Sequence, residues 1–123
     1  MDYSLVEGKI LELCGRYNVI EVLYDTWCAP MLVGGLLDRG VACTPVRQDS
    51  RFLNAAVRAL QRIVDEEQLR HDGNPILRWC ALNACLKANG RGEVRLIKRG
   101  SRDRIDLAVA SLFGLSGYFR EMR

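Results

Sequence analysis

The sequence lacks the features of membrane and exported proteins. It has no run of about 18 apolar residues, and its N-terminus carries no apolar signal-peptide segment. These absences argue against a membrane span, a membrane partner or export. We therefore expect a protein of the cytoplasm.

Metal-binding and nucleophilic patterns of cysteine and histidine are also missing. Five cysteines occur without a C-x-x-C pair, and they lie among apolar residues. This favours reduced, core-type thiols over a disulfide framework or a zinc site. A cysteine nucleophile would need a histidine partner, and His71 is the single histidine of the chain.

What the sequence does contain fits one globular domain over residues 1–123. Hydrophobic residues make up 49% of the 123, which is enough for a modest core. The net charge is +3, but the segment from Lys87 to Arg104 holds seven basic and two acidic residues and so carries +5. Such a patch suits a polyanion such as a nucleic acid backbone, and a solvated surface is the alternative.

The segment Asn18–Trp27 predicts the central strand. Val19–Tyr24 is a run of β-branched, aliphatic and aromatic residues typical of a strand buried on both faces, and Asp25 ends it. In open α/β sheets the chemistry lies outside the carboxyl ends of the strands, which is where Asp25 falls. A capping or turn-stabilising role for Asp25 is the alternative.

Helical patterns surround this strand. A helix is predicted over residues 4–17, with Ser4 and Glu7 as a capping box. A second helix begins near Pro30, ends at Gly40 and buries four apolar side chains: Met31, Leu32, Leu36 and Leu37. Val41–Pro45 then predicts a strand parallel to the first, because a helix connects the two.

The second half continues with a helix over residues 50–67. Its arginines at 51, 58 and 62 share one outer face, where we predict solvation, with phosphate contact as the alternative. Asp72-Gly73 and Asn74-Pro75 predict a turn that leads into a short helix. Residues 83–98, around Asn89-Gly90, predict a β-hairpin, and a helix continued through Leu86 is the alternative.

The last predicted element is a helix over residues 101–119. Ser101 is its expected N-cap, and Asp103 falls in its first turn, where the helix dipole favours a negative charge. Asp106 lies at the edge of the apolar face and could point into a cleft with the sheet. Asp25 and Asp106 could thus converge on Mg²⁺ or Mn²⁺, which prefer carboxylate ligands and in pairs promote phosphodiester cleavage.

Several motifs follow one another along the chain. They are Val22-Leu-Tyr-Asp25-Thr-Trp27, Leu69-Arg-His71-Asp-Gly-Asn74-Pro75-Ile-Leu-Arg-Trp79, Asn83, and Lys98-x-x-Ser101-x-x-Arg104-Ile105-Asp106-x-x-Val109-Ala110. Their joint order and spacing resemble the C-terminal nuclease part of the large terminase subunit of tailed bacteriophages. The resemblance covers essentially the whole chain.

The resemblance implies a fold and a chemistry. It implies an α/β domain of the RNase H-like type, with a short, mostly parallel sheet flanked by helices. It also implies two Mg²⁺ or Mn²⁺ ions held by acidic residues. In the family, this metal site cuts double-stranded DNA during packaging in the bacterial host cell. Carried over by position, Asp25 and Asp106 would be the catalytic, metal-binding acids.

Other residues receive roles by the same carry-over. The expected DNA contacts precede the last helix: Lys98, Arg99, Ser101, Arg102 and Arg104. His71 and Asn74 match the turn of the family, where a structural role is the alternative. Asp103 could substitute as a metal ligand, with helix capping as the alternative.

The sequence also departs from the family pattern. No G-x-x-x-x-G-K-[ST] motif occurs, which excludes ATP-driven translocation for this chain alone. The chain starts at the helix after the strands that carry the first catalytic Asp of the family, so we expect a truncated nuclease with weak activity. A non-catalytic DNA-binding or assembly remnant of the fold is the alternative.

The same departure bears on partners. Without those strands, the edge of the Asp25 strand would be open, which predicts a homo-oligomer formed by strand addition or swapping. In the full-length family, the portal and the small terminase subunit are the expected protein partners.

Overall fold

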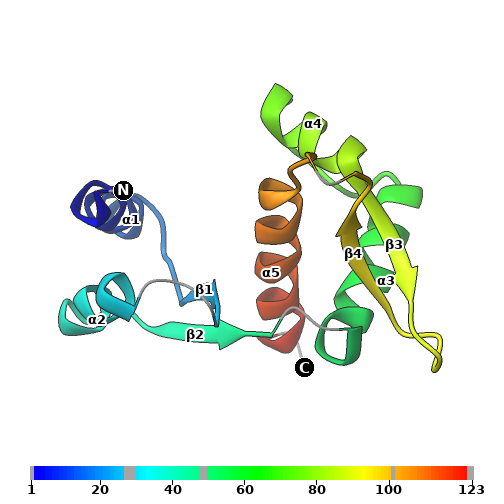
Figure 1. Cartoon of the computed structure of the whole chain (residues 1–123). Coiled ribbons are helices and arrows are strands. Elements are labelled where there is room, and N and C mark those ends of the chain that lie inside the picture. The colour runs from blue at the N-terminus through cyan, green and yellow to red at the C-terminus, as the bar shows by residue number, and fades with distance from the viewer. Residues whose placement is uncertain (1, 27–29, 48–49, 101, 122–123) are drawn as a thin grey trace. The chain divides into compact units, whose positions relative to one another are not determined.

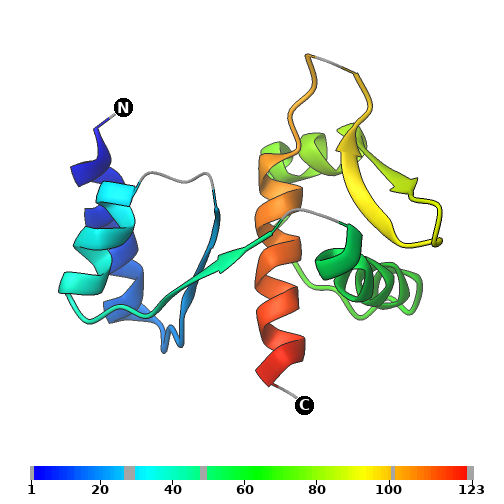
Figure 2. The same cartoon turned by 60° about the horizontal axis from the view of Figure 1, so that its bottom comes forward.

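The computed structural model describes residues 2–26, 30–47, 50–100 and 102–121, apart from the side chains of residues 52 and 119–121. Its contacts divide the chain into two compact units, residues 1–46 and 47–123, and each is described by itself. The described residues form five helices and two two-stranded sheets, which makes the class α/β (Figures 1 and 2). None of the described helices is both long and apolar enough to cross a membrane.

The first unit opens with helix α1, Tyr3–Arg16, whose N-cap is Asp2. The Asp2 carboxylate accepts hydrogen bonds from the Ser4 amide at 3.0 Å and the Ser4 hydroxyl at 2.6 Å. These bonds lower the pKa of Asp2. The predicted capping box of Ser4 and Glu7 is therefore wrong: a better acceptor stands two residues earlier, and Glu7 instead lies 3.8 Å from Arg39.

Two short parallel strands follow α1, and a helix lies between them in the sequence. Strand β1, Val22–Asp25, pairs with β2, Cys43–Val46, and α2, Pro30–Asp38, connects them. The parallel pairing is as predicted, but β1 begins three residues later than expected. Val19 and Ile20 are 38% and 66% exposed, so the expectation of a strand buried on both faces is wrong.

Packing in this unit joins α2 to α1 and to β2. Leu32 and Leu36 are buried, whereas Met31 is 84% and Leu37 is 53% exposed, so only half of the predicted inward set is correct. The αL conformation of Gly40, with φ of 80°, follows the end of α2 as predicted.

The second unit contains three helices and one hairpin. Their bounds are α3 Ser50–Asp65, α4 Pro75–Asn83, β3 Ala84–Ala88, β4 Val94–Lys98 and α5 Asp106–Glu121. Strands β3 and β4 are antiparallel, so the hairpin is confirmed and the alternative helix through Leu86 is wrong. The positive φ in the connecting loop belongs to Gly92 rather than to Gly90.

The core of the second unit is built around α3, which packs against β4 and α5 (Figure 1). The Asn54 side chain of α3 accepts a hydrogen bond of 2.9 Å from the Val94 amide of β4. An Arg58 guanidinium nitrogen donates to the Gly92 carbonyl at 3.0 Å. The most buried apolar residues here are Leu53, Ala56, Val57, Ala59, Cys80, Val94, Ile105, Leu112 and Phe113.

Helix α5 starts later than the sequence predicted. It begins at Asp106, not near residue 101, and Asp103 lies in the loop before it, with its amide donating to the Gly100 carbonyl at 3.1 Å. The prediction that Asp103 occupies the first turn is therefore wrong. The predicted N-cap, Ser101, lies outside the described residues.

Cys14, Cys43, Cys80 and Cys85 are free thiols, and Cys28 lies outside the described residues. Cys80 is buried and the other three are partly buried. Burial raises the pKa of the Cys43 thiol, and the nearby Cys14 raises it further. A raised pKa leaves less reactive thiolate, which is the property of a core cysteine and not of a nucleophile.

We predict that Leu112→Ala strongly destabilises the second unit. Leu112 is 0% exposed, so truncation leaves a cavity and should lower the free energy of unfolding by about 2–5 kcal/mol. Leu82→Ala is the matched control, because Leu82 is 61% exposed and should lose less than about 0.5 kcal/mol. Urea denaturation measures both, and equal losses in the two variants would contradict this packing.

Candidate functional site

Asp25 is the last residue of β1 and pairs with Val46, the last residue of β2. Both strands therefore present their carboxyl ends at the same edge, which is the usual place for a site in a parallel sheet. Asp25 is partly buried. Glu21, just before the same strand, accepts a 2.6 Å hydrogen bond from the Thr44 hydroxyl of β2. The predicted position of Asp25 at the strand end is confirmed.

Asp106 is the first residue of α5 and is exposed. The partial positive charge of a helix N-terminus favours a carboxylate at this position. The next residue in the N-terminal direction, Ile105, is buried, and its carbonyl accepts the Val109 amide at 2.9 Å. Asp106 is thus the first residue of α5, which corrects the prediction that it lies in the second turn of a helix beginning at residue 101.

Asp25 and Asp106 belong to different units. Among the described residues, no group of three or more His, Cys, Asp or Glu side chains could hold a metal ion. The carboxylate donors are of the type that Mg²⁺ and Mn²⁺ prefer.

His71 and Asn74 lie in the exposed turn before α4. The His71 Nδ1 atom accepts the Gly73 amide at 3.0 Å. Asn74 is the N-cap of α4, and its side-chain oxygen accepts the amides of Ile76 at 2.8 Å and Leu77 at 3.3 Å. Both side chains thus have structural contacts within the turn.

The basic residues before α5 are held by Asn83, the last residue of α4. Its backbone carbonyl accepts the Arg99 amide at 2.8 Å, and its side chain donates to the Arg104 carbonyl at 3.2 Å. Asn83 therefore fixes both ends of the loop between β4 and α5. The side chains of Lys98, Arg99, Arg102 and Arg104 are exposed on this loop and at the end of β4.

Within the described part of the chain, the cations of this region form no ion pair. Lys9 pairs with Glu12 at 3.4 Å and Arg39 with Glu7 at 3.8 Å, both in the first unit. The seven cations between Lys87 and Arg104 take part in neither. An uncompensated patch of this kind attracts a polyanion through its field.

A family model described as "Terminase large subunit, endonuclease domain" matches residues 1–121. The chain belongs to this family of terminase nucleases. The resemblance to phage DNA-packaging terminases that the motifs predicted is thereby confirmed.

Individual relatives agree with the family model. The large terminase subunit of Enterobacteria phage HK97 is 28% identical over 112 residues, which are 89% of this chain and 22% of the relative. The crystal structure of the HK97 large terminase superposes with a TM-score of 0.83 at 25% identity, over 95% of this chain and 25% of that one. This terminase nuclease chain therefore spans about a quarter or less of the HK97 protein.

A second solved structure supports the fold alone. The large terminase nuclease from thermophilic phage G20c has a TM-score of 0.74 at 17% identity, over 94% of this chain and 62% of that one. The α/β architecture of this terminase nuclease chain thus matches a nuclease domain that has been solved.

The motifs did not reveal every basic residue that the fold brings together. Lys87 and Arg95 are direct partners in the β3–β4 register, so they lie side by side on one face of the hairpin. The signal was present in the sequence, because both residues lie in arms of the predicted hairpin. Without the register, however, their pairing could not be predicted.

We predict that Asn74 of this terminase nuclease chain acts as a helix cap. Asn74→Ala removes the acceptor of two helix amides and should lower the free energy of unfolding by about 1 kcal/mol. Asn74→Asp keeps a capping oxygen and should stay close to the wild type. Urea denaturation measures both, and an alanine variant as stable as the wild type would refute the capping role.

Proposed function

We propose that the chain is a metal-dependent DNA endonuclease domain of a phage or prophage packaging terminase, and that it is weakly active alone. The observation that carries the proposal is the family match over residues 1–121. The proposal includes an RNase H-like fold for residues 1–123 as a single domain. Its substrate is double-stranded DNA, and its cofactor is Mg²⁺ or Mn²⁺.

Asp25 and Asp106 are the proposed catalytic acids. Asp25 ends a parallel strand and Asp106 begins α5, positions at which a carboxylate can face a ligand. When bound, a divalent cation supplies activation of water and stabilisation of the leaving oxygen. The described residues provide no group of three or more metal-binding side chains. For this reason we propose weak activity; Asp103, partly buried in the loop before α5, is the candidate for a further ligand.

The proposed DNA contacts are the basic side chains on either side of the last loop. Lys98, Arg99, Arg102 and Arg104 are exposed and take no part in an ion pair among the described residues. Each can neutralise a phosphate and release a counterion, which makes the affinity for DNA salt-dependent. Ser101, outside the described residues, belongs to the same proposed surface.

The proposed protein partners follow from the family and from the sheet. The portal and the small terminase subunit are proposed for the full-length protein. Since β1 and β2 form a two-stranded sheet in the part of the chain that the structure describes, their outer edges could pair with a second copy. A homo-oligomer is therefore part of the proposal.

A non-catalytic DNA-binding or assembly remnant is the second candidate function. The observation that favours it is again the absence, within the described residues, of a group of three or more metal-binding side chains. A remnant of this kind would keep salt-sensitive DNA binding and lack metal-dependent cutting.

We predict that the purified chain nicks or linearises plasmid DNA only with Mn²⁺ or Mg²⁺. Asp25→Ala and Asp106→Ala should each lower the rate by roughly 10²-fold or more, the size of effect expected for a group that takes part in catalysis. Asp65→Ala is the control, because Asp65 is an exposed carboxylate at the end of α3.

The outcomes separate the two candidate functions. Loss of cutting in both aspartate variants, with Asp65→Ala unchanged, supports the nuclease. A wild-type chain that binds DNA and cuts no faster than its variants contradicts the nuclease and leaves the remnant.

A further inference from the structure

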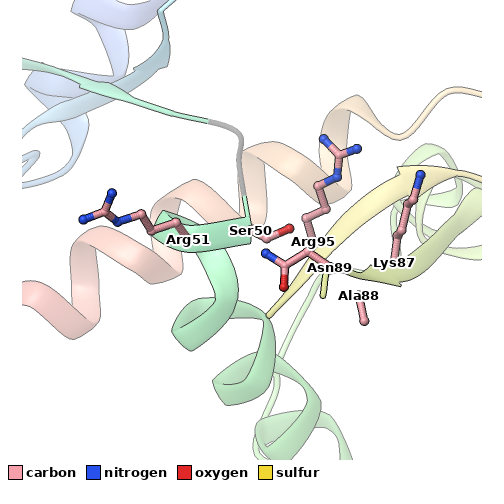
Figure 3. Close-up of a pocket in the computed structure, with 6 residues that line it drawn as sticks. All are labelled: Ser50, Arg51, Lys87, Ala88, Asn89 and Arg95. Atoms are coloured by element: carbon pink, nitrogen blue, oxygen red, sulfur yellow. The ribbon is translucent and has the colours of Figure 1, made fainter. Parts of the chain in front are cut away.

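A pocket of about 290 Å³ lies in the second unit, between the start of α3 and the hairpin. Figure 3 shows the six residues that line it: Ser50, Arg51, Lys87, Ala88, Asn89 and Arg95. None of these residues is among the proposed catalytic acids or among the proposed DNA contacts at residues 98–104. The pocket is therefore a separate feature of the molecule.

Three of the lining side chains are cationic, and their positions do not stabilise the fold. Lys87 and Arg95 are cross-strand partners, and like charges directly opposite each other destabilise a hairpin. Arg51 lies in the first turn of α3, where the helix dipole disfavours a positive charge. None of the three forms an ion pair within the described part of the chain.

Ser50 adds a hydroxyl to the wall of the pocket. The residue is 8% exposed, and no hydrogen bond to its hydroxyl is found among the described residues. In Figure 3 the hydroxyl points towards the side where Asn89 and Arg95 lie. The described residues contain no fully buried side-chain oxygen or nitrogen atom that lacks a hydrogen-bond partner, so this hydroxyl is not a fully buried, unsatisfied group. It can donate a hydrogen bond to an oxyanion that enters the pocket.

The backbone adds further donors. Ser50 is the first residue of the 16-residue helix α3, and the first amides of a helix have no partner within the helix. Amides at this position bind oxyanions readily. The Asn89 side chain, in contrast, already makes hydrogen bonds: it accepts the amides of Arg91 and Glu93 and donates to the Glu93 carboxylate. It therefore shapes the wall of the pocket.

A hydroxyl, helix amides and three cations together suit a phosphate group. From these contacts we propose that the pocket binds a backbone phosphate of DNA, as a second contact beside the loop at residues 98–104. The inference rests on the proposed function for the identity of the polyanion. The segment from Lys87 to Arg104 holds seven basic and two acidic residues and so carries +5. This charge exceeds what one free phosphate can neutralise, so it fits a polyanion such as a DNA backbone better than one free phosphate.

The test is duplex binding by the full chain in EDTA, where no cutting can occur. Fluorescence anisotropy of a labelled duplex of about 20 base pairs, measured over a range of salt concentrations, gives the affinity and the salt slope. Lys87→Gln/Arg95→Gln should bind about tenfold more weakly at about 0.15 M salt, with a slope lower by about 0.9 for each lost contact. Arg51→Gln and Ser50→Ala should weaken binding in the same direction.

The matched control is Arg62→Gln/Arg70→Gln, which removes the same charge from exposed residues. Arg62 lies on the same helix as Arg51, about 16 Å further along. The control should retain most of the affinity. Because Lys87 and Arg95 repel each other, their double variant should also keep or raise the melting temperature.

Equal affinities of the pocket double variant and the control would overturn the proposal. A second result would also overturn it: inorganic phosphate shifts the amide signals of Ser50 and Arg51 in the wild type, while the pocket double variant binds the duplex as tightly as the wild type. This result would mean that the pocket binds free phosphate only. If the double variant unfolds, Ser50→Ala decides: unchanged duplex binding overturns the proposal, and weakened binding supports it.

The nuclease proposal and the pocket can fail separately. A wild-type chain that never cuts DNA while the pocket variants lose duplex affinity refutes the nuclease and keeps the pocket. Cutting that depends on Asp25 and Asp106, with normal duplex binding by the pocket variants, refutes the pocket alone.

Discussion

A hydrogen bond between the Asn54 side chain and the Val94 amide ties helix α3 to the hairpin of the second unit. This 2.9 Å bond joins residues 40 positions apart and fixes the first residue of β4 on α3. Since β3 is registered on β4, the bond also fixes where Lys87 lies. The basic side chains of the hairpin thereby come to lie beside the N-terminus of α3.

In the second unit, the residues that stabilise the fold and the cations that could bind a ligand are different residues. The core of the second unit is formed by Leu112, Val57 and neighbouring apolar side chains, which are almost fully buried. The cations of the hairpin and the following loop contribute no ion pair among the described residues, and one cross-strand pair of them is repulsive. Residues that oppose folding in this way are expected where a ligand compensates their charge, and we propose that a DNA backbone is this ligand.

Much of the fold could be predicted, because the elements follow local rules. The hairpin at 84–98, the parallel pair β1 and β2, and the start of α4 at Pro75 follow from alternation, crossover and the Asn-Pro turn. Boundaries were harder. Asp2 and Ser4 are both good caps, and their competition depends on backbone geometry that the pattern leaves open.

The site could be predicted less well than the elements. The position of Asp25 follows from the end of a hydrophobic run. The start of α5 at Asp106 could not be predicted in the same way, because Ser101 and Asp103 are also residues typical of a helix start. The pocket depends on register and on the packing of α3 against β4. Neither the register nor this packing follows from the spacing of residues along the chain, so the sequence did not predict that Ser50 lines a pocket.

Our main proposal is that Asp25 and Asp106 are both carboxylates that bind a divalent metal ion. Its most direct test is paramagnetic line broadening of backbone amides by substoichiometric Mn²⁺, in the wild type and in Asp25→Asn and Asp106→Asn. We expect signals near each aspartate to broaden in the wild type, and each substitution to remove the broadening around its own position. Wild-type signals that do not broaden near either aspartate, or broadening near an aspartate that persists after its own replacement, would contradict the proposal.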